Sequence, residues 1–206
     1  MFYKDIIALS KYILKISTPN DSEKSSEFAT KLAVIGKNSY FWMVTYIATL
    51  YSDYIIVPLD KSLTNIELNN LLKQSASETL IYDEALEYLI SDSTKDLNIE
   101  NSQLKQKINM SELISIVIDI EEKQKNNEIP ELEEKQKNII LKEDDVRIIV
   151  YTSGTTSSAK GVMLTQKNIA RNTEIINKSV KVYNHDKTLA FLPYHHTLGL
   201  TGQLIF

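Results

Sequence analysis

The stretch VRIIVYTSGTTSSAKGVMLT (146–165) combines three sequence patterns. Its first part, VRIIVY (146–151), is apolar and largely β-branched except for Arg147, a pattern that is typical of a strand buried on both faces. Small and hydroxylated residues then continue up to a single lysine at 160, after which GVMLT (161–165) has a strand pattern again. The stretch therefore predicts a polar loop at the carboxyl end of a buried strand, where ligands bind in open α/β sheets.

The same type of buried run recurs along the chain, alternating with segments of helical periodicity. The predicted strands are 31–36, 54–59, 79–83, 114–120, 146–151 and 188–194. The predicted helices are 3–16, a helix capped by Asn38 or Ser39 that ends near Tyr51, a helix opened by the capping box Thr64–Glu67, 84–91 and 166–182. This alternation predicts an α/β fold with a mainly parallel sheet and helices on both faces.

Composition excludes several classes of protein. The chain has 206 residues with a net charge of −4, which argues against a nucleic-acid partner, because such a partner requires a clustered basic face. It has no cysteine, so disulfides, thiolate metal sites and cysteine nucleophiles are all excluded. No apolar run reaches the roughly 18 residues of a transmembrane helix, and a cytoplasmic location is the expectation.

A charged segment interrupts the alternation at 121–145, where 14 of 25 residues are charged. The hexapeptide EEKQKN occurs in it twice, at 121–126 and 133–138. The duplication fits either a docking segment or a solvated, variable insertion, and we interpret it as the insertion, because charge runs are usually solvated.

The loop of the opening stretch has the elements of a phosphate site. A glycine at 154 lets consecutive N–H groups approach an anion, the hydroxyl groups add donors, and Lys160 adds a mobile charge. A Walker P-loop is excluded, because Ala159 occupies its second glycine position and Gly161 its Ser/Thr position, and because a strand pattern follows. A flexible linker would lack the ordered apolar flanks.

YTSGTTSSAKGVMLTQKNI (151–169) resembles the phosphate-loop signature of the adenylate-forming superfamily, YTSGTTGxPKGVxLTHxN, which includes acyl-CoA synthetases, aryl-CoA ligases, luciferases and adenylation domains. Matching positions include Tyr151–Thr156, Lys160–Val162, Thr165 and Asn168, and the departures are Ser157, Ala159 and Gln166. The first two departures bear on the stiffness of the loop. The replacement of histidine by Gln166 has no interpretation from sequence.

Two further segments extend the resemblance. FLPYHHTLGL (191–200) is similar to the LPxxH block of the family, and the segment from 31 to 72, with VPLDKSL (57–63), is similar to its strand–helix–strand–helix unit. The versions of these motifs are most similar to those of bacterial long-chain fatty acyl-CoA synthetases.

The resemblance implies a function and a set of site residues. The family activates a carboxylate with ATP and Mg²⁺ to an acyl-adenylate and transfers the acyl group to CoA, so a fatty acid, ATP and CoA are the implied substrates. The implied residues for the ATP phosphates are Thr152, Ser153, Gly154, Thr155, Thr156, Ser157, Lys160 and Gly161, of which Lys160 and Thr152 are the catalytic candidates. His196 is the implied substrate-binding residue, between the nucleotide and the acyl pocket, and no residue is assigned to a protein-bound metal.

The resemblance also implies that residues 1–206 form part of the large N-terminal domain, with the phosphate loop at 151–161 and without the family's C-terminal domain. We expect such a fragment to bind ATP with millimolar affinity at best and to have no ligase activity of its own. Two alternatives stay open: an enzyme that adenylates an aryl acid or an amino acid or loads a carrier protein, and a short non-catalytic chain that binds phosphates or a partner. The sequence does not indicate the oligomeric state.

Overall fold

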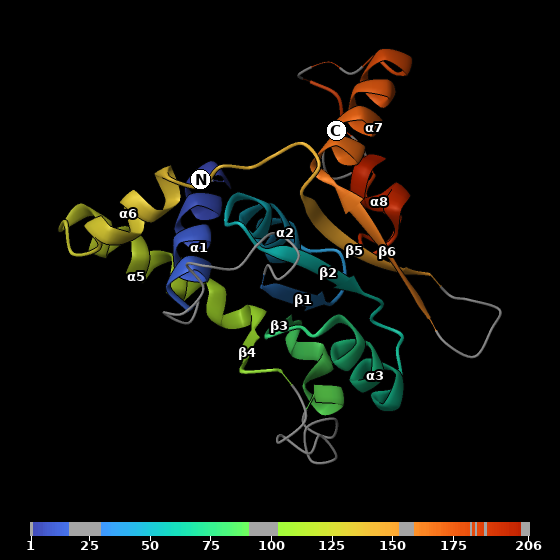
Figure 1. Cartoon of the computed structure of the whole chain (residues 1–206), viewed down its shortest axis with the longest axis horizontal. Coiled ribbons are helices and arrows are strands. Elements are labelled where there is room, and N and C mark those ends of the chain that lie inside the picture. Colours follow the sequence, from blue (N-terminus) through green and yellow to red (C-terminus); the bar gives the residue numbers. More distant parts are fainter. Residues whose placement is uncertain are drawn as a thin grey trace.

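The computed structural model describes residues 2–16, 30–90, 103–152, 159–181, 183, 185–187 and 189–202. Within these residues, six strands form one sheet in the order β4-β3-β1-β2-β5-β6 (Figure 1). The strands are β1 (Lys31–Ile35), β2 (Ile55–Leu59), β3 (Thr79–Tyr82), β4 (Gln106–Asn109), β5 (Val146–Thr152) and β6 (Lys160–Thr165). The neighbouring pairs are parallel except for β5 and β6, which are antiparallel. The predicted α/β fold with a mainly parallel sheet is confirmed.

Helices cover both faces of the sheet (Figure 1). They are α1 (Phe2–Ile16), α2 (Tyr40–Tyr51), α3 (Asn65–Ser75), α5 (Leu113–Lys125), α6 (Pro130–Lys137), α7 (Gln166–Ser179) and α8 (Thr197–Gly202). Alternate residues of β1 show the two layers: Leu32 and Val34 pack with α1, α2 and α5, whereas Ala33 and Ile35 pack with α3. Because both faces of β1 are buried from Leu32 to Ile35, this part of its sequence is continuously apolar.

The helix starts follow the predicted caps. Ser39, one of the two candidates, caps α2 by accepting a hydrogen bond from the backbone N–H of Trp42. The predicted capping box at α3 is present in both directions, since Thr64 accepts from the N–H of Glu67 and the Glu67 carboxylate accepts from the N–H of Thr64. The helix predicted for 84–91 is the short 3₁₀ helix η3 (Glu84–Leu86) followed by one helical turn at 87–90.

The strand predicted for 114–120 is wrong, because this segment lies within helix α5. The buried residues of α5 are Leu113, Val117 and Ile120, whose spacing places them on one face of a helix, while Ile114 and Ile118 are exposed. The strand at this place in the chain is β4, and the 3₁₀ turn η5 (Met110–Glu112), capped by the side chain of Asn109, leads from it into α5.

The charged segment 121–145 supplies the end of α5 and all of α6. Most of its side chains are exposed, as expected for a solvated segment, but α6 also packs against α1. Leu132 is buried there, the Lys11 ammonium lies 3.2 Å from Oε1 of Glu133, and Gln136 donates a hydrogen bond to the hydroxyl of Ser10.

The two copies of the duplicated segment have equivalent environments. Residues 117–126 and 129–138 align with an offset of 12 positions, and the buried Val117 and Ile120 of the first copy correspond to the buried Ile129 and Leu132 of the second. In each copy the final asparagine is the C-cap of its helix and donates its N–H to the carbonyl four residues earlier. The sequence repeat is therefore also a structural repeat.

The strand predicted for 188–194 is also wrong. Residues 189–193 have no regular secondary structure, and Leu189 and Phe191 are exposed. A strand needs a neighbour for its backbone groups. Here the carbonyls of Ala190 and Leu192 instead accept hydrogen bonds from the side chain of Asn38, so this segment is tied to the end of β1 without joining the sheet.

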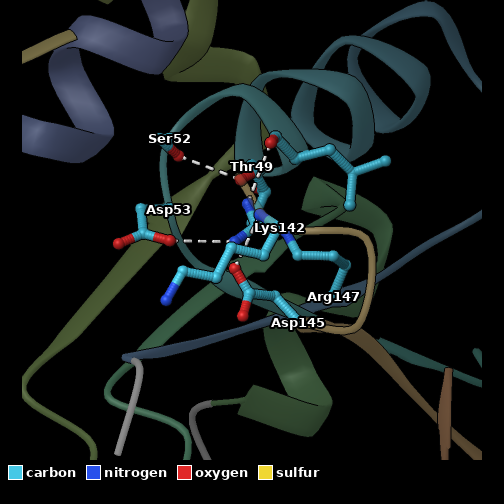
Figure 2. A network of polar contacts seen from close by, with 7 residues as sticks. Thr49, Ser52, Asp53, Lys142, Asp145 and Arg147 are labelled. Atoms are coloured by element: carbon cyan, nitrogen blue, oxygen red, sulfur yellow. Dashed lines mark hydrogen bonds and ion pairs between the residues drawn. The ribbon is translucent and has the colours of Figure 1, made fainter. Parts of the chain in front are cut away.

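A buried arginine connects β5 to the turn between α2 and β2 (Figure 2). Nη1 of Arg147 lies 3.0 Å from Oδ1 of Asp53, and Nη2 donates a hydrogen bond of 2.9 Å to the carbonyl of Leu50. Burial lowers the pKa of Arg147, while the charges of Asp53 and Asp145 act in the opposite direction. The contacts attach β5, the strand that ends at Thr152, to the core of the sheet.

Candidate functional site

The base of the predicted phosphate loop is the antiparallel pair β5–β6. In its register Thr152 lies opposite Lys160, and the Thr152 hydroxyl is 3.5 Å from the carbonyl of Lys160. Both side chains are exposed. The other predicted loop residues, Ser153, Gly154, Thr155, Thr156 and Ser157, lie outside the described residues. The structure therefore places the backbone of Thr152 beside that of Lys160 where the loop leaves the sheet.

Close packing across the strand pair explains the glycine that follows Lys160. Gly161 lies opposite Tyr151, and a Cβ atom on it would come within 3.1 Å of Cγ2 of Ile149 and 3.3 Å of Cε1 of Tyr151. Burial raises the pKa of Tyr151, so its ring acts as a neutral packing surface. Gln74 of α3 adds a hydrogen bond of 3.1 Å to the carbonyl of Ala159. These contacts hold the two chain segments at the base of the loop against the sheet and α3.

The end of the signature forms the start of α7. Thr165 and Asn168 make a reciprocal capping box, in which Thr165 Oγ1 accepts from the Asn168 N–H and Asn168 Oδ1 accepts from the Thr165 N–H. Gln166, which replaces the family's histidine, donates its backbone N–H to the carbonyl of Asp145. Its side-chain Oε1 is buried and has no hydrogen-bond partner within the described residues. The matching Thr and Asn positions thus have a helix-capping role.

The second part of the site is the LPxxH block. Its Tyr194 is buried, with the ring centroid 5.3 Å from that of Trp42 in α2. The Tyr194 N–H donates to Oδ1 of Asn38, and the His196 N–H donates to the carbonyl of Pro193. The block is therefore a turn fixed on the carboxyl end of β1 and on α2.

The two histidines of the block have different environments. The side chain of His195 is only 11% exposed, and its Nε2 lies 3.4 Å from Oδ2 of Asp60 without forming a hydrogen bond. Burial lowers the pKa of His195 more than the Asp60 carboxylate raises it, so the imidazole is neutral at neutral pH. The contact between His195 and Asp60 is therefore not an ion pair. Burial would raise the pKa of Asp60, but the net effect is a lower pKa, chiefly because of hydrogen bonds from Ser62. His196, the predicted site residue, is exposed, with its ring centroid 4.2 Å from that of His195.

His195 should make folding stability depend on pH. Because its pKa is lower in the folded chain than in the unfolded chain, the unfolded chain binds more protons as the pH falls below the ordinary histidine value of about 6.5. We expect urea denaturation to show a loss of unfolding free energy between pH 7.5 and 5.5 that is smaller in His195→Gln. His185→Gln is the control, since that side chain is 85% exposed. Equal pH dependence in all three proteins would contradict the neutral, buried state of His195.

A pocket of 240 Å³ lies beside the block, where β1 and β2 end. Its lining residues are Gly36, Lys37, Asn38, Lys61, Ala190, Phe191, Pro193 and His195. Parallel strands place their carboxyl ends on one edge of a sheet, and Thr152 ends a further parallel strand of this sheet. Within the described residues, however, no hydrogen bond or ion pair connects His196 with Thr152 or Lys160.

Sequence reasoning missed several residues that shape this site. The sequence indicates for Asn38 only a helix-capping role, and it includes Asp60 only in a segment that is similar to the family's. Gly199 belongs to the LPxxH segment and has no role that the sequence alone indicates, although a Cβ atom on it would clash with the carbonyl oxygen of Pro193. Their roles depend on contacts between distant segments, which leave no local pattern; the spacing of Gly199 after the histidines was the only available signal.

The part of the chain that the structure describes contains no group of three or more acidic, histidine or cysteine residues arranged to hold a metal ion. Among the same residues, no helix is both long and apolar enough to span a bilayer.

Comparison with known families decides the classification. The sequence profile described as AMP-binding enzyme matches residues 27–206. The chain belongs to the AMP-binding enzyme family. Over 209 aligned residues this AMP-binding chain is 27% identical to the mitochondrial malonate–CoA ligase ACSF3 of Xenopus laevis, covering 98% of the chain and 33% of the relative. Fatty acyl-CoA synthetase B of Dictyostelium discoideum is 26% identical, with 82% of the chain and 26% of the relative covered.

A third relative matches over a shorter stretch. The medium-chain-fatty-acid–[acyl-carrier-protein] ligase TtuA of Teredinibacter turnerae is 37% identical over 67 residues, which cover 31% of the chain and 10% of the relative. The AMP-binding chain spans a third or less of the length of these three relatives.

Solved structures show the same fold. The N-terminal domain of FACL13 from Mycobacterium tuberculosis superposes with a TM-score of 0.74 at 18% identity, over 98% of the AMP-binding chain and 46% of that domain. ATP-bound MatB from Rhodopseudomonas palustris gives a TM-score of 0.65 at 19% identity, over 97% and 35% of the two chains.

Proposed function

We propose that this chain is the phosphate-binding part of an ATP-dependent acid–thiol ligase. In the proposed reaction a carboxylate oxygen attacks the α-phosphorus of ATP, and pyrophosphate leaves as the acyl-adenylate forms. The sulfur of CoA then attacks the acyl carbon, and AMP leaves with the former carboxylate oxygen. Family membership and the malonate, fatty-acid and carrier-protein ligases among the relatives support this class of reaction.

The observation that carries the proposal is the pairing of Thr152 with Lys160 at the base of the signature loop. The exposed ammonium of Lys160 would offset the negative charge of the β- and γ-phosphates, and the Thr152 hydroxyl would donate a hydrogen bond. We propose that Ser153, Gly154, Thr155, Thr156 and Ser157 line the same phosphates. Gly161 would act indirectly, by allowing the two strands to pack closely around Tyr151.

Mg²⁺ fits this site as part of the nucleotide complex. Thr152 offers a neutral oxygen and Lys160 a cation, which are not the carboxylate ligands of a dedicated Mg²⁺ site. The ion would therefore be held mainly by the phosphate oxygens, where it neutralises charge. This chain's residues contribute the positioning of those phosphates.

The expected test is Lys160→Ala. In the protein that contains this chain, we expect the substitution to slow acyl-adenylate formation about 100-fold, because one preorganised group that stabilises transition-state charge is lost. ATP–pyrophosphate exchange measures this step. Lys4→Ala, at an exposed lysine of α1, removes the same charge and should leave exchange unchanged. Normal exchange in Lys160→Ala would refute the assignment.

A second readout uses the 206-residue chain alone. Titration with ATP, followed by NMR signals of β5 and β6, should show weak millimolar binding that Lys160→Ala removes. Detectable acyl-CoA synthesis by the chain alone would contradict our expectation that it is inactive without the rest of the ligase.

We further propose a long-chain fatty acid as the carboxylate and His196 as a residue between the nucleotide and the acyl group. The motif versions in 57–63 and 191–200 and the Dictyostelium fatty acyl-CoA synthetase favour this substrate. The malonate–CoA ligase favours a short dicarboxylate as the second candidate, and the TtuA ligase favours a carrier protein as a second acceptor. Exchange assays with palmitate and malonate, and acyl transfer to CoA or to a carrier protein, separate these possibilities.

A further inference from the structure

The side chain of Asn38 makes three hydrogen bonds to the segment that contains the LPxxH block, more than 150 positions later in the chain. The Nδ2 group of Asn38 donates hydrogen bonds of 3.2 Å to the carbonyl of Ala190 and 2.8 Å to the carbonyl of Leu192. Its Oδ1 accepts a bond of 3.0 Å from the N–H of Tyr194. The amide of Asn38 thus uses both of its N–H hydrogens as donors and its oxygen as an acceptor, all with backbone groups of this turn.

Contacts on other sides hold the same turn. Gly199 packs against the carbonyl of Pro193 so closely that a side chain has no space. The ring of Tyr194 lies against that of Trp42, and His195 points toward Asp60. The exposed His196 follows directly, so its position is set by a turn that distant parts of the chain support.

We infer that Asn38 is a positioning residue, which places His196 for the reaction by fixing the 190–194 turn on the end of β1. This inference rests on the proposed function, in which His196 lies between the nucleotide and the acyl group. Asn38 follows the strand β1 within three residues and also precedes the helix cap Ser39, so its own position is fixed by the core of the sheet.

A substitution that changes only the hydrogen bonds of Asn38 can distinguish a positioning role from a role in packing. Asn38→Asp has nearly the same shape and still accepts from the N–H of Tyr194. Its carboxylate, however, cannot donate and would face the carbonyl oxygens of Ala190 and Leu192. The turn should therefore move while the apolar core, which Asn38 does not enter, is retained.

The first experiment records the imidazole NMR signals of the 206-residue chain, which contains three histidines. We expect Asn38→Asp to shift the signals of His195 and His196 and to leave that of His185 in place. Asn70→Asp, at an exposed position of α3, is the matched control and should shift none of them. Asn38→Ser, which is neutral and shorter, provides a second variant. Unshifted His196 signals in both Asn38 variants would overturn the inference.

The second experiment measures exchange kinetics in the protein that contains this chain. We expect Asn38→Asp to lower kcat about 100-fold, since small misplacement of a reacting group has effects of this size, with KM for ATP nearly unchanged. A raised KM with normal kcat would contradict a positioning role. If Lys160→Ala leaves exchange normal, the proposed function fails, whereas normal kinetics in Asn38→Asp together with slow exchange in Lys160→Ala refute only the role of Asn38.

Discussion

Gly199→Ala will destabilise the folded chain by about 3 kcal/mol or more, the upper part of the range for overpacked substitutions. The added methyl would lie 2.2 Å from the carbonyl oxygen of Pro193 and 2.8 Å from its carbonyl carbon. Because both obstacles are backbone atoms, no side-chain rotation relieves the contact. Either α8 must move away from the turn, or the turn must leave its contacts with Asn38 and Trp42.

Another glycine in the same helix offers a matched control. A Cβ atom on Gly202 would have its nearest contact at 3.6 Å, with Cδ1 of Leu198, which is an ordinary van der Waals distance. Gly202→Ala should therefore change the free energy of unfolding by no more than about 1 kcal/mol, the scale of helix propensity. Urea denaturation of both variants measures the difference. Similar stabilities for Gly199→Ala and Gly202→Ala would show that the close approach of α8 to Pro193 is not present in solution.

Arg147→Ala will also have a large effect, with an expected loss of about 3 kcal/mol. The side chain of Arg147 is 1% exposed, so its removal leaves a cavity between β5 and the α2–β2 turn, and the carbonyl of Leu50 loses its donor. Asp53 contributes little to this loss, because its side chain is 62% exposed and water replaces the contact.

Arg147→Met separates packing from charge. The methionine side chain retains much of the volume and removes a charge whose burial is costly, so we expect a loss of about 1 kcal/mol. Urea denaturation of the two variants under the same conditions makes the comparison. A methionine variant as unstable as the alanine variant would show that the polar contacts in Figure 2, rather than packing, dominate the stabilisation.

The regular part of the fold could be predicted because its signals are local. Buried strands such as β5 have predominantly apolar sequences, in which Arg147 is the exception, and the capping box at Thr64 is readable from four residues. The strand prediction for 114–120 is wrong because a short apolar run fits the periodicity of a helix as well as that of a strand. The helical alternative required Leu113, one position before the run, as the start of the buried face, and it left Ile114 and Ile118 in solvent.

Some residues of the candidate site could likewise be predicted from a local sequence pattern, and others could not. Thr152 and Lys160 belong to a contiguous signature with a strand pattern on both sides of the loop, so both are visible in the sequence, and the antiparallel register that pairs them comes from the structure. The support of the LPxxH block depends on contacts between Asn38 and residues more than 150 positions away, which a single sequence does not reveal. The apolar run 188–194 therefore predicts a strand, although in the structure residues 190–194 are held by Asn38 and by other distant contacts instead of by a neighbouring strand.

Because of the twelve-residue repeat between β4 and β5, the length of this connection does not determine where β5 lies in the sheet. Each copy buries its equivalent apolar positions in the layer around α1, and Arg147 attaches β5 to the sheet independently of both. The connection can thus gain a complete unit outside the sheet while the strand that ends at Thr152 keeps its place. In this fold, the part of the chain that is free to vary in length lies directly before the part whose geometry must stay constant.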